Sequence, residues 1–174
     1  RGYWDYDGGG LGDMGQHYLD PTQYILGKDN ESPVEIEVDT PLQHPDAALP
    51  WRRVRMKYAD GCEIILDGDN TMKGEPFIAG PDGQISKGFS SDIPHLHQKL
   101  ATLPDPEPQE TDFVKCVRTR RQFALNEANG HRSAMLVNLA VIGLRMGSGV
   151  LHFDPATETF IGNEAANRLV SQPM

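Results

Sequence analysis

The stretch WDYDGGGLGDMGQHYLD, residues 4–20, combines a glycine-rich turn with the start of a helix. Three consecutive glycines, 8 to 10, can adopt backbone angles that other residues avoid, which suits a tight bend or the close approach of a ligand. We expect a helix to begin at about Gly10. Its apolar flank is predicted to consist of Leu11, Met14, Tyr18 and Leu19.

Three polar residues of this helix are the candidates for chemistry. Asp13 and His17 are four residues apart and therefore lie one turn apart on one face, and Asp20 follows at i+7 on the same face. A histidine titrates near neutral pH, and a neighbouring carboxylate orients the imidazole and stabilises its cation. The spacing therefore suits proton transfer at a substrate hydroxyl. The alternative is an ordinary surface pair, with Asp20 and Pro21 beginning a turn.

Both ends of the chain carry recognisable motifs. The run GGGLGDMGQHYLD, residues 8–20, resembles the motif that opens the second domain of the glucose-fructose oxidoreductase and inositol dehydrogenase (Gfo/Idh/MocA) family. NEANGHRSAMLVNLAVIGLRMG, residues 126–147, is similar to a helix near the close of that domain. NEAANRLVSQPM, residues 163–174, resembles the tail of the bacterial subgroup. The resemblance covers nearly the whole chain.

The resemblance implies an enzyme role for two residues. His17 matches the histidine that accepts a proton from the substrate hydroxyl, and Asp13 matches the carboxylate that orients substrate and histidine, so both are candidate catalytic and substrate-binding residues. Asp20 matches a position that is often acidic, and we assign it a structural role. The family's catalytic lysine belongs to an upstream domain, and the substrate is expected to be a sugar, cyclitol or related polyol.

The resemblance also implies partners. Members carry an amino-terminal Rossmann domain that binds NAD or NADP, and the sheet of their second domain often forms a homo-oligomer interface. The chain itself has no G-x-G-x-x-G fingerprint after a predicted strand. We therefore interpret residues 1–174 as a single substrate and oligomerisation domain of a longer two-domain NAD(P)-dependent oxidoreductase, and we expect it to be inactive alone.

The composition argues against two classes of binding partner. The net charge of −9 argues against nucleic-acid binding, which needs clustered Lys and Arg. The sequence has no apolar run near the ~20 residues that span a bilayer, so no membrane partner is expected. The two cysteines, Cys62 and Cys116, are predicted to be free thiols. Because the first residue falls inside a motif, the sequence does not predict whether the protein is cytoplasmic or periplasmic.

Hydrophobic periodicity predicts an α+β fold. Alternating residues predict a strand at 34–38 and a hairpin over 53–66 with Asp60-Gly61 at its turn, and a second hairpin is predicted over 76–85. These strands are expected to form an antiparallel stretch of four or five. Further predictions are a strand at 150–153 and helices at 92–103, from Thr111 to about Arg121, from Asn126 or Asn129 onward, and from Asn163 to Leu169. The fold class is a mostly antiparallel open sheet with helices on one face, lacking a Rossmann domain.

Two other functions fit the residues. Asp13, His17 and Asp20 could hold a metal ion from one helix, which would make the protein a metal-assisted enzyme. A non-catalytic binding or oligomerisation module could use the same sheet. His44, His95 and His97 are interpreted as loop or surface residues, and we predict no metal site.

Overall fold

The computed structural model describes residues 2–105 and 108–171 and divides into two compact units. The first unit comprises residues 1–70 and 125–174, and the second comprises residues 71–124. The connector at 104–109 falls inside the second unit, with residues 106–107 outside the described part. The expectation of one domain over residues 1–174 stays a prediction.

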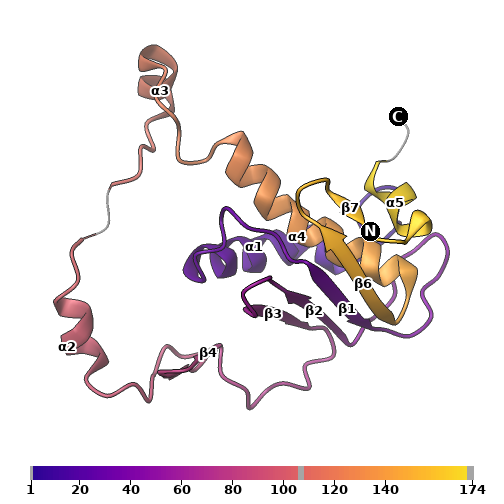
Figure 1. Cartoon of the computed structure of the whole chain (residues 1–174), viewed down its shortest axis with the longest axis horizontal. Coiled ribbons are helices and arrows are strands. Elements are labelled where there is room, and N and C mark those ends of the chain that lie inside the picture. The colour runs from indigo at the N-terminus through magenta and orange to yellow at the C-terminus, as the bar shows by residue number, and fades with distance from the viewer. Residues whose placement is uncertain (1, 106–107, 172–174) are drawn as a thin grey trace. The chain divides into compact units, whose positions relative to one another are not determined.

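A five-stranded antiparallel sheet organises the first unit (Figure 1). Its strands are β1 (Glu35–Asp39), β2 (Arg53–Lys57), β3 (Glu63–Asp67), β6 (Gly149–Asp154) and β7 (Thr159–Phe160), in the order β3-β2-β1-β6-β7. The central strand β1 pairs with β2 on one side and with β6 on the other, so that Ile36 lies opposite both Met56 and Leu151. The β2–β3 hairpin turns at Asp60 and Gly61, as predicted from the sequence.

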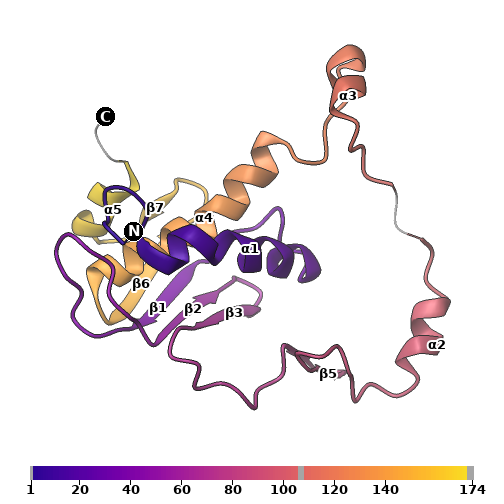
Figure 2. The same ribbon diagram turned by 180° about the vertical axis from the view of Figure 1, so that it is seen from behind.

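Three helices complete the first unit: α1 (Gly9–Ile25), α4 (Glu127–Met146) and α5 (Glu164–Val170). Figure 1 shows α1 and α4 behind the strands, and Figure 2, seen from behind, brings both helices to the front, so they lie on the same side of the sheet. The opposite side presents charged residues such as Glu37, Arg55 and Glu63. The predicted α+β class is therefore confirmed.

The helix α4 is the centre of the core. Asn126 begins it, because its side-chain oxygen accepts the backbone N–H groups of Ala128 and Asn129. Its apolar residues then pack against the sheet and against α1, including Leu136, Ala140 and Leu144, which are fully buried. Buried partners on the strands are Ile36, Val38, Val54, Met56, Ile64, Leu151 and Phe153.

The second unit contains short elements. These are β4 (Ile78–Gly80) paired with β5 (Gly83–Ile85), α2 (Leu96–Ala101) and α3 (Phe113–Thr119). The prediction that the second hairpin continues the main sheet was wrong, because β4 and β5 pair with each other and β6 takes the place beside β1. A hairpin satisfies its own inner hydrogen bonds, so its sequence does not reveal which sheet it joins.

Several predicted helix boundaries also need correction. The helix expected over 92–103 begins only at Leu96, because the Asp92 carboxylate accepts the N–H of Gln84 in β5 and is not available as a cap. Asp112, not Thr111, caps α3 by accepting the N–H of Lys115. Asn163 caps α5 as predicted. Among the described residues, no helix has the length and apolar character needed to cross a membrane.

Candidate functional site

The glycine-rich turn begins α1 through backbone geometry and not through a side-chain cap. Gly8 has φ 69° and ψ 20°, a left-handed conformation that favours glycine. The Asp7 carboxylate accepts the N–H groups of Gly2 and Gly9 on either side of this turn. At Gly12 a Cβ would lie 1.5 Å from the Asp7 carbonyl oxygen, so no other residue fits there. The motif thus fixes where α1 begins.

Asp13 and His17 lie one turn apart on α1, and both side chains are exposed. His17 has no hydrogen-bond or ion-pair partner among residues 2–105 and 108–171, so its imidazole is available to a ligand. The buried side of the helix consists of Leu11, Gly15, Leu19 and Gln23. Helical spacing therefore brings the two candidate residues together on one face, as the sequence predicted, and the structure places that face away from the core.

The predicted apolar flank of α1 is partly wrong. Leu11 and Leu19 are buried, but Met14 and Tyr18 are 45% and 67% exposed. The core is completed instead by Gly15, which lies close to Val137 of α4, and by Gln23. A hydrophobic pattern does not detect a buried glycine or glutamine, so the predicted stripe lies to one side of the buried one.

The Asp20 side chain binds helix α4 and is not part of the exposed pair of Asp13 and His17. Its carboxylate accepts a hydrogen bond from the Ser133 hydroxyl of α4, at 2.7 Å between the oxygens. The same hydroxyl oxygen accepts a hydrogen bond from the side-chain amide of Gln16. Neither Ser133 nor Gln16 was recognised from the sequence. The one available signal was a serine at the start of the largely apolar run of α4.

Proline at position 21 lies inside α1, which continues to Ile25. The alternative in which Asp20 and Pro21 begin a turn is therefore wrong. Proline has no backbone N–H, so the carbonyl of His17, four residues earlier, lacks its helical hydrogen bond. The helix ladder thus has a gap directly after the candidate histidine.

The C-terminal end of α1 is tied to the β2–β3 turn by a buried lysine. Lys28 is 5% exposed, and its ammonium lies 2.7 Å from Asp60 and 2.8 Å from Glu31. The hydrogen bond to Asp60 is the largest cause that raises the pKa of Lys28, and the bond to Lys28 is the largest cause that lowers the pKa of Asp60. Two carboxylates thus stabilise the buried cation.

A cavity of about 700 Å³ lies elsewhere in the first unit, along α4. At one end Arg145 lies over the Trp4 ring, 5.7 Å from its centroid. At the other end His131 and Glu158 are 2.8 Å apart. Asp13, His17 and Asp20 are not among the residues that line it. The candidate proton-transfer residues and this cavity are therefore separate features of the unit.

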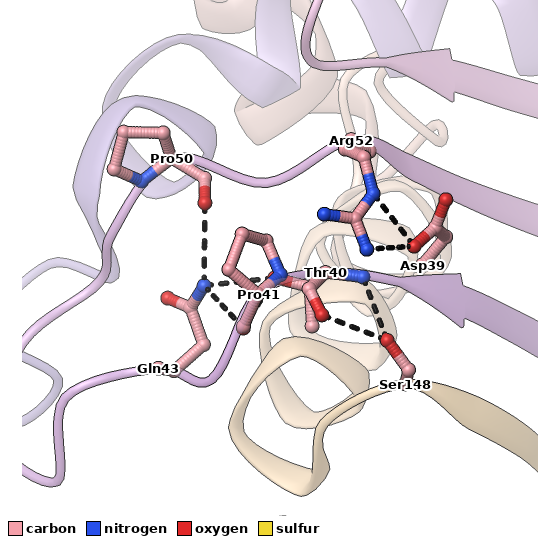
Figure 3. A network of polar contacts seen from close by, with 7 residues as sticks. All are labelled: Asp39, Thr40, Pro41, Gln43, Pro50, Arg52 and Ser148. Atoms are coloured by element: carbon pink, nitrogen blue, oxygen red, sulfur yellow. Dashed lines mark hydrogen bonds and ion pairs between the residues drawn. The ribbon is translucent and has the colours of Figure 1, made fainter.

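Hydrogen bonds with Ser148 hold the start of the loop at residues 40–50, and an ion pair joins two residues that flank the loop (Figure 3). The Ser148 hydroxyl accepts the N–H of Thr40 and donates to its carbonyl, and Arg52 binds the carboxylate of Asp39. His44 is exposed in this loop, and its carbonyl accepts the indole N–H of Trp4. The loop therefore packs against the segment that precedes α1.

The other histidine and cysteine candidates lie on other elements than α1. His95 precedes α2 with a left-handed backbone, and His97 is exposed on that helix. Both cysteines are free, and Cys62 is half-buried whereas Cys116 is buried. Within the described part of the chain, no group of three or more His, Cys, Asp or Glu side chains could hold a metal ion.

Comparison with known proteins connects the whole chain to one family model. The model is described as "Oxidoreductase family, C-terminal alpha/beta domain", and it matches residues 1–174. Searches of curated proteins and of solved structures give no significant match. The match includes both compact units.

Proposed function

Because the chain belongs to the Gfo/Idh/MocA oxidoreductase family as a C-terminal alpha/beta domain, we propose that it supplies the substrate pocket and proton-transfer residues of an NAD(P)-dependent enzyme. The proposed substrate class is a sugar, cyclitol or related polyol. In this proposal His17 accepts the proton of a substrate hydroxyl, and Asp13 orients both the hydroxyl and the imidazole.

The observation that carries this proposal is the exposed pair on α1. Asp13 and His17 are presented to a ligand from a helix whose opposite side is fixed in the core. A rigid helix holds reacting groups more precisely than a loop does. The arrangement supports acid–base chemistry, in which one imidazole and one carboxylate act on the same hydroxyl.

The described residues do not fit a dinucleotide. A Rossmann-type site needs parallel strands joined by a helix, with a glycine-rich turn directly after the first strand. Here the large sheet is antiparallel, and the glycine turn follows only an isolated bridge at Tyr3. We propose that an upstream Rossmann domain of the same protein binds NAD or NADP and supplies the redox chemistry.

The test is His17→Ala in the protein that includes the cofactor-binding domain. Loss of a general base typically costs 10²–10⁴-fold in rate, so we expect turnover to fall by about 100-fold or more with unchanged affinity for NAD(H). His97→Ala is the matched control, because His97 is likewise an exposed histidine on a helix, α2 of the second unit. Unchanged turnover of the His17 variant would show that this assignment is wrong.

A role in assembly is a second proposal, which the open side of the sheet favours. Arg55 lies 3.1 Å from Glu37 and 3.8 Å from Glu63 there, and Val150 is 50% exposed. We propose that two copies meet through this side as a homo-oligomer. An exclusively monomeric sedimentation profile at micromolar concentration would contradict it, and full activity of the His17 variant would favour a purely non-catalytic module.

A further inference from the structure

We propose that Ser133 and Asp20 are positioning residues, which set the rotation of α1 about its axis and thereby the direction in which His17 faces. The inference rests on the proposed function of His17. The observation that carries it is the hydrogen bond from the Ser133 hydroxyl on α4 to the Asp20 carboxylate on α1.

The Ser133 hydroxyl makes two hydrogen bonds to α1. It is 5% exposed, it donates its one hydrogen to Asp20, and it accepts from the amide of Gln16. Gln16 and Asp20 are four residues apart and so lie on the same side of α1. One buried atom of α4 therefore binds two successive turns of α1.

The helices α1 and α4 approach each other closely at two glycines. At Gly15 a Cβ would lie 3.4 Å from Val137, and at Gly8 a Cβ would lie 3.1 Å from Val141. Glycines allow the helices to approach closely, but they have no side chains that interdigitate with the partner. Leu11 and Leu19 anchor the buried side of α1 in the core, and the directional hydrogen bonds at Ser133 constrain its rotational setting beside them.

The position of these bonds relative to His17 is the reason to connect them with its function. Gln16 directly precedes His17, and Asp20 follows it by three residues. Between them, the His17 carbonyl has lost its helical hydrogen bond because of Pro21. The bonds to Ser133 span this gap, so they supply the constraint that the backbone lacks at this turn.

The role requires a hydrogen-bond acceptor at position 20 but no charge. Asp20→Asn keeps an oxygen that can accept from Ser133, whereas Asp20→Ala removes it. A catalytic or metal-binding carboxylate would be lost in both variants. The comparison of Asn with Ala at this position therefore separates positioning from a direct chemical role.

The experiment records the NMR signal of the His17 imidazole and also measures turnover. Imidazole NMR signals are recorded for the wild type, Ser133→Ala, Asp20→Ala and Asp20→Asn, and the His17 signal is assigned by its loss in His17→Gln. We expect Ser133→Ala and Asp20→Ala to shift this signal and to lower kcat by about 10-fold with KM for the cofactor unchanged, since small misplacements of reacting groups cost this much or more. Asp20→Asn is expected to retain the wild-type signal and rate.

Ser148→Ala is the matched control, because it removes a serine hydroxyl that binds Thr40 in the loop of Figure 3. An unshifted His17 signal and unchanged kcat in Ser133→Ala would overturn the proposal. Loss of the wild-type signal and rate in Asp20→Asn as well would also overturn it, in favour of a role for the charge. If Ser133→Ala does not fold, the two Asp20 variants decide the question.

The two proposals can fail separately. If His17→Ala keeps full turnover, the proposed function fails, and the position of the His17 signal still shows whether Ser133 orients the helix. If His17→Ala is inactive and Ser133→Ala resembles the wild type, only the positioning role fails.

Discussion

Gly143 of α4 lies directly against Val38 of the central strand β1: a Cβ at position 143 would be 2.8 Å from Cγ2 of Val38 and 3.4 Å from Cγ2 of Ile36. The absence of a side chain there lets the helix rest on the sheet. Val38 is buried and β-branched, so it cannot easily rotate away.

We therefore predict that Gly143→Ala destabilises the protein. Overpacking a core costs about 1–3 kcal/mol, which exceeds the gain of at most ~1 kcal/mol from better helix propensity. Gly130 in the first turns of the same helix is the control, because a Cβ there would meet nothing within 4 Å. Gly130→Ala should raise the free energy of unfolding, measured by chemical denaturation. Equal stability of the two variants would contradict this account of the helix–sheet contact.

The Lys28–Asp60 pair predicts a pH dependence of stability. The pKa of Asp60 is lowered in the folded state, so its stabilising contribution is present above the unfolded pKa of about 4 and is lost as the pH falls below it. The pKa of Lys28 is raised, so its contribution is lost only as the pH rises above its unfolded value of about 10.4. The pair should stabilise the fold between these limits.

The measurement is Tm against pH for the wild type and Asp60→Asn. We expect the variant to melt several degrees lower at pH 7, because Lys28 loses a charged partner, and the difference to shrink toward pH 3. Asp82→Asn, in the exposed turn between β4 and β5, serves as the control. A difference in Tm that is constant from pH 3 to pH 7 would rule out this electrostatic explanation.

The cofactor proposal predicts that NAD(H) does not bind to residues 1–174 alone. The described strands pair antiparallel and so do not form the parallel βαβ unit of a Rossmann site. Titration followed by nicotinamide fluorescence should show binding only when the upstream domain is present. Micromolar binding by the 174-residue chain would mean that the cofactor site has been placed in the wrong domain.

Most elements of the first unit could be predicted because their signals are local. The alternation around Ile36 and Val38, the Asp60-Gly61 turn and the caps at Asn126 and Asn163 each depend on a few adjacent residues. The second hairpin was assigned to the wrong sheet for a related reason, since strand pairing beyond a hairpin depends on contacts that are distant in sequence. Local sequence signals predict an element, but they do not predict which element lies beside it.

For the candidate site, the sequence by itself determined that Asp13 and His17 share a face of one helix, because helical periodicity depends on spacing alone. Only the tertiary structure decided that this face points outward and that Asp20 turns to another helix. Its partner Ser133 is 113 residues away along the chain. Gly15 and Gln23 complete the buried face of α1, and whether a glycine or a glutamine is buried depends on what packs against it.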